Sequence, residues 1–205
     1  MFTTENNKGF TLLEMLISMA IFTIAVFIVM TTLFSITNVQ KKVIAKQSAE
    51  DNLRYAFESM TKEMRTGKKF HCGTSASDVS LTPQNCTFSA CQSSSLNCGV
   101  SFTFQNSALQ TVTYQVVNNQ LVKSSDGNPP DCVSGPYINC QKLTSLDLVI
   151  VNKVNFYVSG SAAGDGLQSL ATIVLEGQVL DPKNIGTAKL NLQTTISKRG
   201  LLDQP

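Results

Sequence analysis

The N-terminal part of the chain carries a long uninterrupted apolar pattern. Residues Met15 to Gln40 contain no charged side chain, and most are Leu, Ile, Val, Met, Phe or Ala. At about 1.5 Å per helical residue, this segment is longer than the ~30 Å hydrocarbon core of a bilayer. The pattern predicts a transmembrane helix. Because the region of Ser35 and Thr37 offers no convincing signal-peptidase site, we expect the segment to be retained.

Beyond Lys41 the pattern becomes one-sided. Apolar residues recur at spacings of three and four up to Met64, with charged residues between them, which predicts an amphipathic helix with one buried face. No Gly or Pro occurs from Phe10 to Thr66, so one continuous helix is expected, ended by Gly67. At 1.5 Å per residue it would be roughly 85 Å long. Its first half would project from any domain that the remaining residues build.

The second half of the chain has the alternation typical of strands. The predicted strands are Val100–Phe104, Thr111–Val117, Gln120–Lys123, Leu146–Val158, Leu170–Val179 and Leu190–Ile196. Asn118 and Asn119 tolerate the positive φ of a tight hairpin turn. The sequence therefore predicts an α+β fold. The second half of a long N-terminal helix, from Lys46 to Thr66, covers an antiparallel β-sheet that has a disulfide-stapled loop.

Six cysteines lie in polar, loop-like surroundings: Cys72, Cys86, Cys91, Cys98, Cys132 and Cys140. An even number in such surroundings indicates disulfides formed in an oxidising compartment. If Cys132 and Cys140 pair, closing their short loop contributes ~2–3 kcal/mol, and the other four allow three connectivities. The alternative is a metal site that includes His71, but the cysteine spacing fits no compact zinc template.

Composition excludes several classes of protein. The chain of 205 residues has a net charge of +2 and one histidine, which rules out a histidine pair and gives no broad basic footprint for nucleic acid. A Ser-His-Asp hydrolase would have to use His71, and no G-x-S-x-G, Walker A or GxGxxG sequence is present. The acidic residues Asp165, Glu176 and Asp181 lack calcium-loop spacing. We predict no enzyme activity, catalytic residue, cofactor or metal.

Glu14 is the anomaly of the apolar segment. A carboxylate near the start of a membrane helix costs a few kcal/mol unless something compensates it, so it is a candidate functional residue. The alternative is a side chain that snorkels at the membrane interface. The residues alone leave these two interpretations open.

The segment from Lys8 to Phe22, Lys-Gly-Phe-Thr-Leu-Leu-Glu-Met-Leu-Ile-Ser-Met-Ala-Ile-Phe, resembles the N-terminus of type IV prepilins and type II secretion pseudopilins, and the match extends to about residue 34. The resemblance implies cleavage by a prepilin peptidase between Gly9 and Phe10 and N-methylation of Phe10. It further implies that Glu14 pairs with the N-terminal amine of a neighbouring subunit and sets the axial register.

A weaker resemblance covers Asp51 to Arg65, which is similar to minor pilins of the W type and pseudopilins of the J type. The absence of a proline before Pro83 leaves the transmembrane helix unbroken, unlike many major pilins, and favours a minor or initiating subunit. The implied partners are the prepilin peptidase, other pilin or pseudopilin subunits, the inner-membrane assembly platform and, before assembly, the lipid bilayer. Pilus, secretion and DNA-uptake machines are not distinguished.

The expected organisation is a leader at 1–9, a transmembrane and filament-core helix at 10–40, an amphipathic helix at 41–66 and a Cys-containing β-rich domain at 67–205. We expect single-pass insertion in the inner membrane with the C-terminal domain extracytoplasmic, then residence in the filament. Lysines 41, 42 and 46 oppose this orientation by the positive-inside rule, but large domains translocate regardless of flanking charge. A tip adhesin or DNA-capture subunit, using Lys68 and Lys69 on phosphate, is the alternative function.

Overall fold

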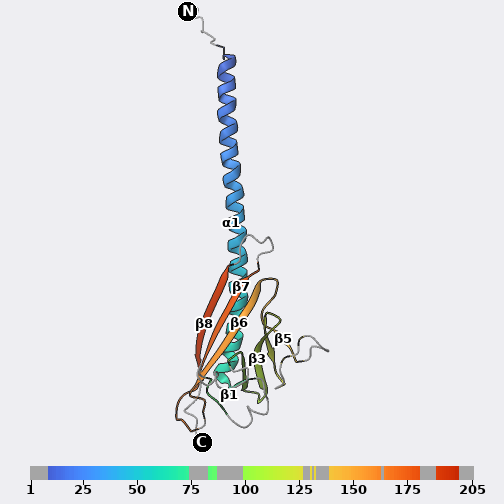
Figure 1. Cartoon of the computed structure of the whole chain (residues 1–205), viewed down its shortest axis with the longest axis vertical. Coiled ribbons are helices and arrows are strands. Elements are labelled where there is room, and N and C mark those ends of the chain that lie inside the picture. The colour runs from blue at the N-terminus through green and yellow to red at the C-terminus, as the bar shows by residue number, and fades with distance from the viewer. Residues whose placement is uncertain are drawn as a thin grey trace, which may run out of the picture. The chain divides into compact units, whose positions relative to one another are not determined.

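The chain divides into two compact units, Met1–Ile44 and Ala45–Pro205. A computed structural model describes residues 9–73, 83–86, 99–126, 130, 132, 139–162, 164–180 and 188–198. One helix, α1 (Leu12–Thr66), begins in the first unit and ends in the second (Figure 1). The predicted continuous helix is therefore confirmed, with its start two residues later than Phe10.

In the first unit, the large apolar side chains of α1 are exposed. The hydroxyl groups among them are bonded within the helix. Ser18 Oγ donates to the Glu14 carbonyl at 2.7 Å, Thr23 Oγ1 to Met19 at 2.7 Å and Thr37 Oγ1 to Phe34 at 3.0 Å. Because hydrocarbon supplies no hydrogen-bond partners, these internal bonds make the hydroxyls compatible with a lipid environment.

The second unit contains two antiparallel sheets. The first has five strands in chain order: β1 (Lys68–Cys72), β2 (Ser101–Gln105), β3 (Thr111–Val117), β4 (Gln120–Ser124) and β5 (Gln141–Lys142). The second has three, again in chain order: β6 (Val149–Ser159), β7 (Leu170–Val179) and β8 (Lys189–Ser197). Neighbouring strands in each sheet are also consecutive in the chain and antiparallel, so both sheets are meanders.

The α+β prediction is confirmed, but the strands form two sheets instead of the single sheet expected. Along its other edge, β6 meets loops and turns of the first sheet. Cys86 forms an isolated bridge with Val158, and the Phe156 amide donates to the Gly99 carbonyl at 2.6 Å. Alternation identifies which face of a strand is buried, but it does not say where a sheet ends.

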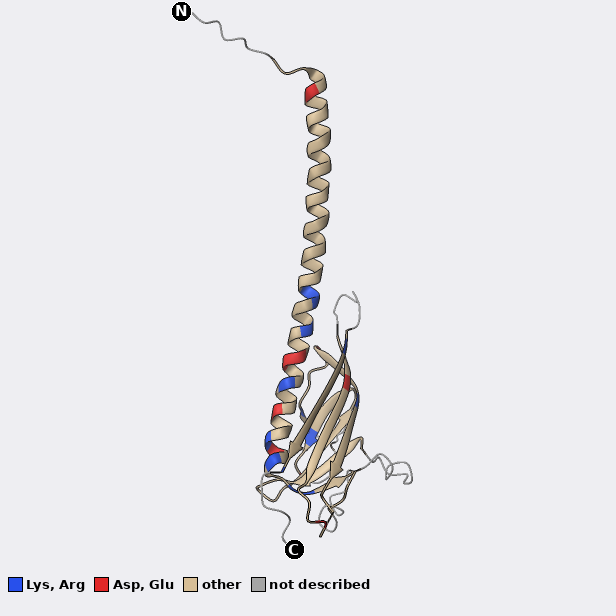
Figure 2. Ribbon diagram, turned by 90° about the vertical axis from the view of Figure 1, so that its left-hand side faces the viewer, with Lys and Arg blue, Asp and Glu red and all other residues tan. Residues whose placement is uncertain are grey.

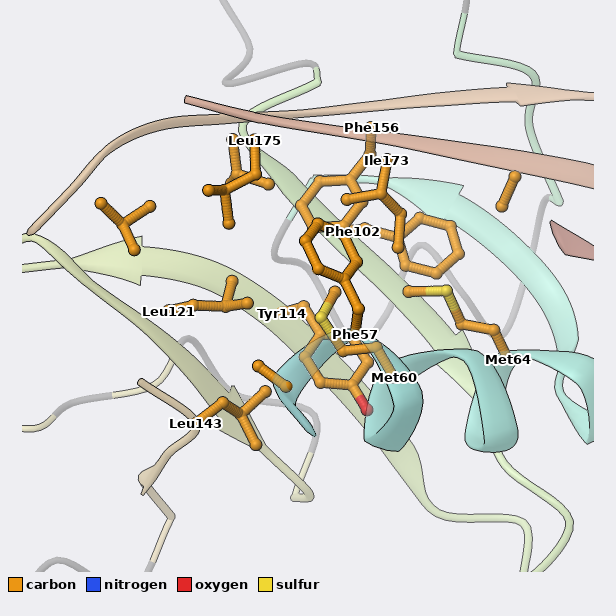
Figure 3. Packing of buried hydrophobic residues seen from close by; sticks show 14 of the residues in the cluster. Phe57, Met60, Met64, Phe102, Tyr114, Leu121, Leu143, Phe156, Ile173 and Leu175 are labelled. Carbon is orange, nitrogen blue, oxygen red and sulfur yellow. The ribbon is translucent and has the colours of Figure 1, made fainter. Parts of the chain in front are cut away.

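The C-terminal part of α1 covers the sheets through its apolar face. Its buried residues are Ala49, Leu53, Ala56, Phe57, Met60 and Met64. Figure 3 shows Met60 and Met64 beside Phe102 and Tyr114 in the core. Phe70, Phe102 and Phe104 add edge-to-face and stacked ring contacts, with centroids 5.3–6.0 Å apart. Burial of this face fixes the helix on the sheets, as the periodicity predicted.

Strand β1 was not predicted, because residues 68–72 lie between the expected helix end at Gly67 and the polar surroundings of the cysteines. The backbone of Lys69 has φ 54°, and the register with β2 shifts between Lys68 and His71. As a result, Phe70, His71 and Cys72 are buried in succession instead of alternating. A bulge of this kind hides the period-2 signal on which a strand prediction depends.

Glycine is required at position 67, just after α1, for a steric reason. A Cβ atom built there would lie 2.5 Å from Cδ2 of Phe104, so the helix end and β2 pack too closely for any side chain. The hairpin between β3 and β4 is as predicted, since Asn118 and Asn119 have φ 49° and 62°. Both angles lie in the left-handed region that a two-residue hairpin turn requires.

Candidate processing and assembly site

The described residues before the helix are exposed. Gly9, Phe10 and Thr11 precede the first helical residue, and Phe10 has 77% of its surface exposed. No atom lies within 4 Å of a Cβ built on Gly9. The peptide bond between Gly9 and Phe10 therefore lies in an exposed stretch of backbone outside the helix.

Thr11 caps the helix. Its Oγ1 accepts a hydrogen bond from the Glu14 amide at 3.3 Å, and its carbonyl accepts the Met15 amide at 3.2 Å. Thr11 and Glu14 thus stand at the two positions of a capping box, Thr-x-x-Glu. Glu14 also lies in the first helical turn, where the helix dipole favours negative charge. Sequence reasoning missed this role of Thr11, although the Thr-x-x-Glu spacing signals it.

The helix that follows is long and apolar enough to cross a membrane. An 18-residue window of α1 has a mean hydropathy of 2.5, and none of that window is buried within the protein. Glu14 is exposed at the head of this stretch. A single carboxylate in such a position needs a compensating charge if it enters hydrocarbon.

Two disulfides join described residues. Cys72, at the end of β1, pairs with Cys86, with Cα atoms 5.9 Å apart, and Cys132 pairs with Cys140, with Cα atoms 5.4 Å apart. Cys86 in turn bridges to Val158 of β6, so the first disulfide links the two sheets. Cys91 and Cys98 lie outside the described residues.

A charged cluster missed by sequence reasoning lies beneath α1. Glu63 forms an ion pair with Lys123 of β4, whose side chain is 12% exposed, and accepts a hydrogen bond from the Tyr114 phenol at 2.7 Å. Burial and the Glu63 carboxylate both raise the pKa of Tyr114 far above its ordinary value. The feature of the sequence that could have identified Glu63 is its position one residue before the buried Met64.

A groove of about 720 Å³ runs between α1 and the free edge of β8. Its helical wall includes Lys46, Glu50 and Arg54, and Phe57 and Leu192 lie deeper. The mixture of opposite charges on one wall offers no cluster that would bind a particular small ligand. We therefore assign no small ligand to this groove.

Among the described residues, those considered for other chemistry are not gathered into one site. His71 is buried in β1, and Lys68 and Lys69 are exposed residues of that strand. Within the described residues, no group of three or more His, Cys, Asp or Glu side chains could hold a metal ion. Asp181 lies outside the described residues.

Comparison with known proteins gives one finding. The family model of the prokaryotic N-terminal methylation motif matches residues 5–30, the segment that contains Gly9, Phe10 and Glu14. Neither a curated protein nor a solved structure gives a significant match. The motif implies processing by a prepilin peptidase and points to a structural subunit that assembles with other pilins. The chain carries, at the head of a long apolar helix, the N-terminal methylation motif that is the signature of type IV pilins and pseudopilins.

Proposed function

We propose that this chain is a minor pilin or pseudopilin, a structural subunit that enters, initiates or caps a type IV pilus or type II secretion pseudopilus. The observation that carries the proposal is the methylation motif at residues 5–30, followed by the uncharged helix from Met15 to Gln40. The unbroken α1, which has no proline, supports a minor or initiating role.

In this proposal a prepilin peptidase cuts between Gly9 and Phe10 and methylates the new amino group of Phe10. The open backbone at Gly9 supports this step, since α1 begins only at Leu12. Cleavage leaves a mature chain with a positive N-terminus four residues before Glu14.

Glu14 would then pair with the N-terminal amine of a neighbouring subunit. A charge pair in surroundings of low dielectric is attracted strongly, and each partner left alone there is penalised. The exposed position of Glu14 supports contact with another chain. The intrahelical bond from its amide to Thr11 leaves the carboxylate available for this role.

The second unit would lie on the extracytoplasmic side of the inner membrane before assembly. Its disulfides support this orientation, because Cys72–Cys86 and Cys132–Cys140 need an oxidising compartment. Accessibility of the second unit to a cytoplasmic protease would contradict the orientation.

The decisive experiment is the intact mass and N-terminal sequence of the membrane-extracted chain, from cells with and without prepilin peptidase. We expect a chain that begins at N-methyl-Phe10 only where the peptidase is present. The variant Gly9→Leu is the matched control, because it should insert normally and stay uncut. A start at Met1 in both strains would contradict the proposal and favour a signal-anchored binding protein.

A further inference from the structure

The outer edge of β8 is a long strand edge that the described part of the chain leaves bare. Among the described strands, β8 pairs with β7 alone, and β7 lies between it and β6 (Figure 1). All nine residues of β8 follow β7 in register, without a bulge or a proline. Only Lys189, at the first position, is charged, and Figure 2 shows long uncharged stretches of strand beside the charged bands of α1. Such a row of unpaired amides and carbonyls is a template for another chain.

The other three sheet edges that the structure describes are each protected. At one edge of the first sheet, β1 has a register shift and a positive φ at Lys69. The opposite edge is β5, which has only two residues. The outer edge of β6 meets the first sheet, where the Val151 amide donates to the Asn119 carbonyl at 2.9 Å. Bulges, short strands and covering segments are the usual protection of an edge, so the bare edge of β8 is an exception within this molecule.

The ladder between β7 and β8 identifies which backbone groups of the bare edge point outward. The Val179 amide donates to the Ala188 carbonyl at 2.9 Å, and the Lys198 amide donates to the Ser169 carbonyl at 3.0 Å. In an antiparallel pair, every second residue directs both of its backbone groups to the neighbouring strand. The even-numbered residues between these two bonds therefore face β7. The odd-numbered residues direct their amides and carbonyls away from it: Lys189, Asn191, Gln193, Thr195 and Ser197.

The groove of about 720 Å³ beside β8 leaves room for a partner at these groups. Its strand wall consists of residues 189–194, which extend for roughly 20 Å at about 3.4 Å per residue. Phe57 of α1 and the half-buried Leu192 give it an apolar floor. An extended segment in this groove can pair its backbone with Asn191 and Gln193 while every second side chain packs on the floor.

We propose that the outer edge of β8 binds an extended segment of a different subunit, which adds to the three-stranded second sheet as a further strand. The segment alternates apolar and polar side chains, because one of its faces meets Leu192 and Phe57 and the other is level with Asn191 and Gln193. The inference rests on the proposed function, which surrounds this chain with other subunits anchored in the same membrane.

A second copy of this chain does not fit the edge. Among the strands that the structure describes, the only bare edge it offers is its own β8. Antiparallel pairing of two β8 edges turns one copy end over end, with the part of α1 in its second unit, whereas a shared membrane orients both anchors alike. Parallel pairing joins the inner face of one sheet to the outer face of the other, so Leu192 would be level with polar residues such as Gln193. The occupant is therefore a different chain.

The test places a photo-crosslinking amino acid at Asn191, Gln193 or Thr195 of the full-length chain, in membranes of the cells that make it. These three side chains are exposed beside the bare edge. We expect crosslinks to another chain that carries the methylation motif, at positions that move by two residues for each step along β8. The proposal is overturned by crosslinks without this two-residue step, by crosslinks to a second copy or to a chain without the motif, and by the absence of crosslinks.

Two substitutions at Gln193 separate strand pairing from side-chain contact. Gln193→Pro removes an amide that points away from β7, at a kind of position where edge strands tolerate proline. With the crosslinker at Asn191, it should lower the yield about tenfold, because a backbone hydrogen bond and the alignment of the added strand are lost. Gln193→Ala, the matched control, keeps the amide and should stay within about twofold of the unsubstituted chain. Equal yields from the two variants would contradict strand addition.

Hydrogen exchange decides the question without a variant, should thermal denaturation show that Gln193→Pro is unfolded. The amides of Asn191 and Gln193 should exchange about tenfold more slowly in membranes that contain the other subunits than in membranes where this chain is expressed alone. The amides of Leu190 and Leu192, which face β7, are the internal reference and should change less. Equal slowing at all four amides, or none, would overturn the proposal.

Failure of this inference is distinguishable from failure of the proposed function, because the mass of the same chain reports leader cleavage. Cleavage before Phe10 without stepwise crosslinks keeps the pilin assignment and overturns the docking of a strand on β8. Stepwise crosslinks from a chain that is never cleaved keep the docking edge and contradict the proposed function.

Discussion

The carboxylate of Glu63, on the covering helix, accepts a hydrogen bond of 2.7 Å from the phenol of Tyr114 on β3. The same carboxylate forms an ion pair with Lys123 on the neighbouring strand β4. One side chain of α1 therefore satisfies two polar groups of the first sheet. Because all three are partly or fully buried, the cluster fixes the rotation of α1 on the sheet as well as its attachment.

We first predict that Glu63→Ala destabilises the protein. It leaves the ammonium of Lys123 without its carboxylate in a poorly solvated position, at a cost of about 1–3 kcal/mol. The measurement is chemical denaturation followed by circular dichroism. Glu58→Ala, at an exposed position on the same helix, is the control and should change the unfolding free energy by no more than about 0.5 kcal/mol. Equal effects of the two substitutions would contradict a role for the cluster.

The second prediction concerns pH. The pKa of Tyr114 is raised by burial and by Glu63, so the folded protein keeps this proton where the unfolded chain loses it. This contribution is fully present below the ordinary tyrosine pKa of about 10 and declines above it. The unfolding free energy should therefore fall by about 1.4 kcal/mol per pH unit above that pH, relative to Tyr114→Phe.

This difference is measured by denaturation of both proteins at matched pH values. Titration of tyrosinate absorbance gives an independent check. Near pH 11, about one unit above the ordinary tyrosine pKa, the folded protein and Tyr114→Phe should show the same tyrosinate absorbance. A titration step that disappears in Tyr114→Phe would refute the prediction.

Third, Gly67→Ala should destabilise the protein by about 1–3 kcal/mol, because its methyl group would overlap the ring of Phe104. The overlap predicts coupling between the two positions. In a Phe104→Leu background the same substitution should cost less, and the double-mutant cycle measures the difference. Additive effects would show that the cost at Gly67 arises from the backbone and not from Phe104.

Fourth, removal of the Cys72–Cys86 disulfide by Cys72→Ser/Cys86→Ser should lower the unfolding free energy by about 2–4 kcal/mol. Part of this loss is expected because the disulfide connects β1 to β6, through the bridge between Cys86 and Val158. Thermal denaturation of the oxidised protein and of this variant gives the comparison. An unchanged midpoint would contradict a structural role for this disulfide.

Fifth, Glu14→Leu should be inserted and cleaved normally but should fail to enter filaments, because it lacks the charge that pairs with the N-terminal amine. The measurement is the amount of the subunit in purified filaments, relative to its amount in the membrane. Thr23→Leu is the control on the same helix, since its hydroxyl is bonded only to backbone carbonyls of its own chain. Normal incorporation of Glu14→Leu would refute the proposed pairing.

Local patterns in the sequence were sufficient for much of the fold. The spacing of Leu53, Phe57 and Met60 identified the buried helix face, and Asn118-Asn119 identified the hairpin. These features depend on residues close in sequence, whose periodicity follows from backbone geometry. The apolar segment and the motif around Gly9 and Glu14 were readable for the same reason.

Features that depend on distant residues were not predicted. The bulge at Lys69 hid β1, and nothing near Glu63 in sequence announces Lys123, sixty residues later. The division into two sheets depends on which loop of the first sheet meets β6 at Val158. Each depends on packing between segments far apart in the chain, where local propensity carries no information.

The sequence by itself determined the anchor, the processing motif, the amphipathic helix and the hairpin-rich antiparallel strands, because each is a periodic or contiguous pattern. Only the tertiary structure decided that Glu63 is a shared partner of Tyr114 and Lys123, and that Gly67 is required by Phe104. The physical reason is that burial and pairing of a side chain depend on the segments packed against it. Those segments are brought together only when the chain folds.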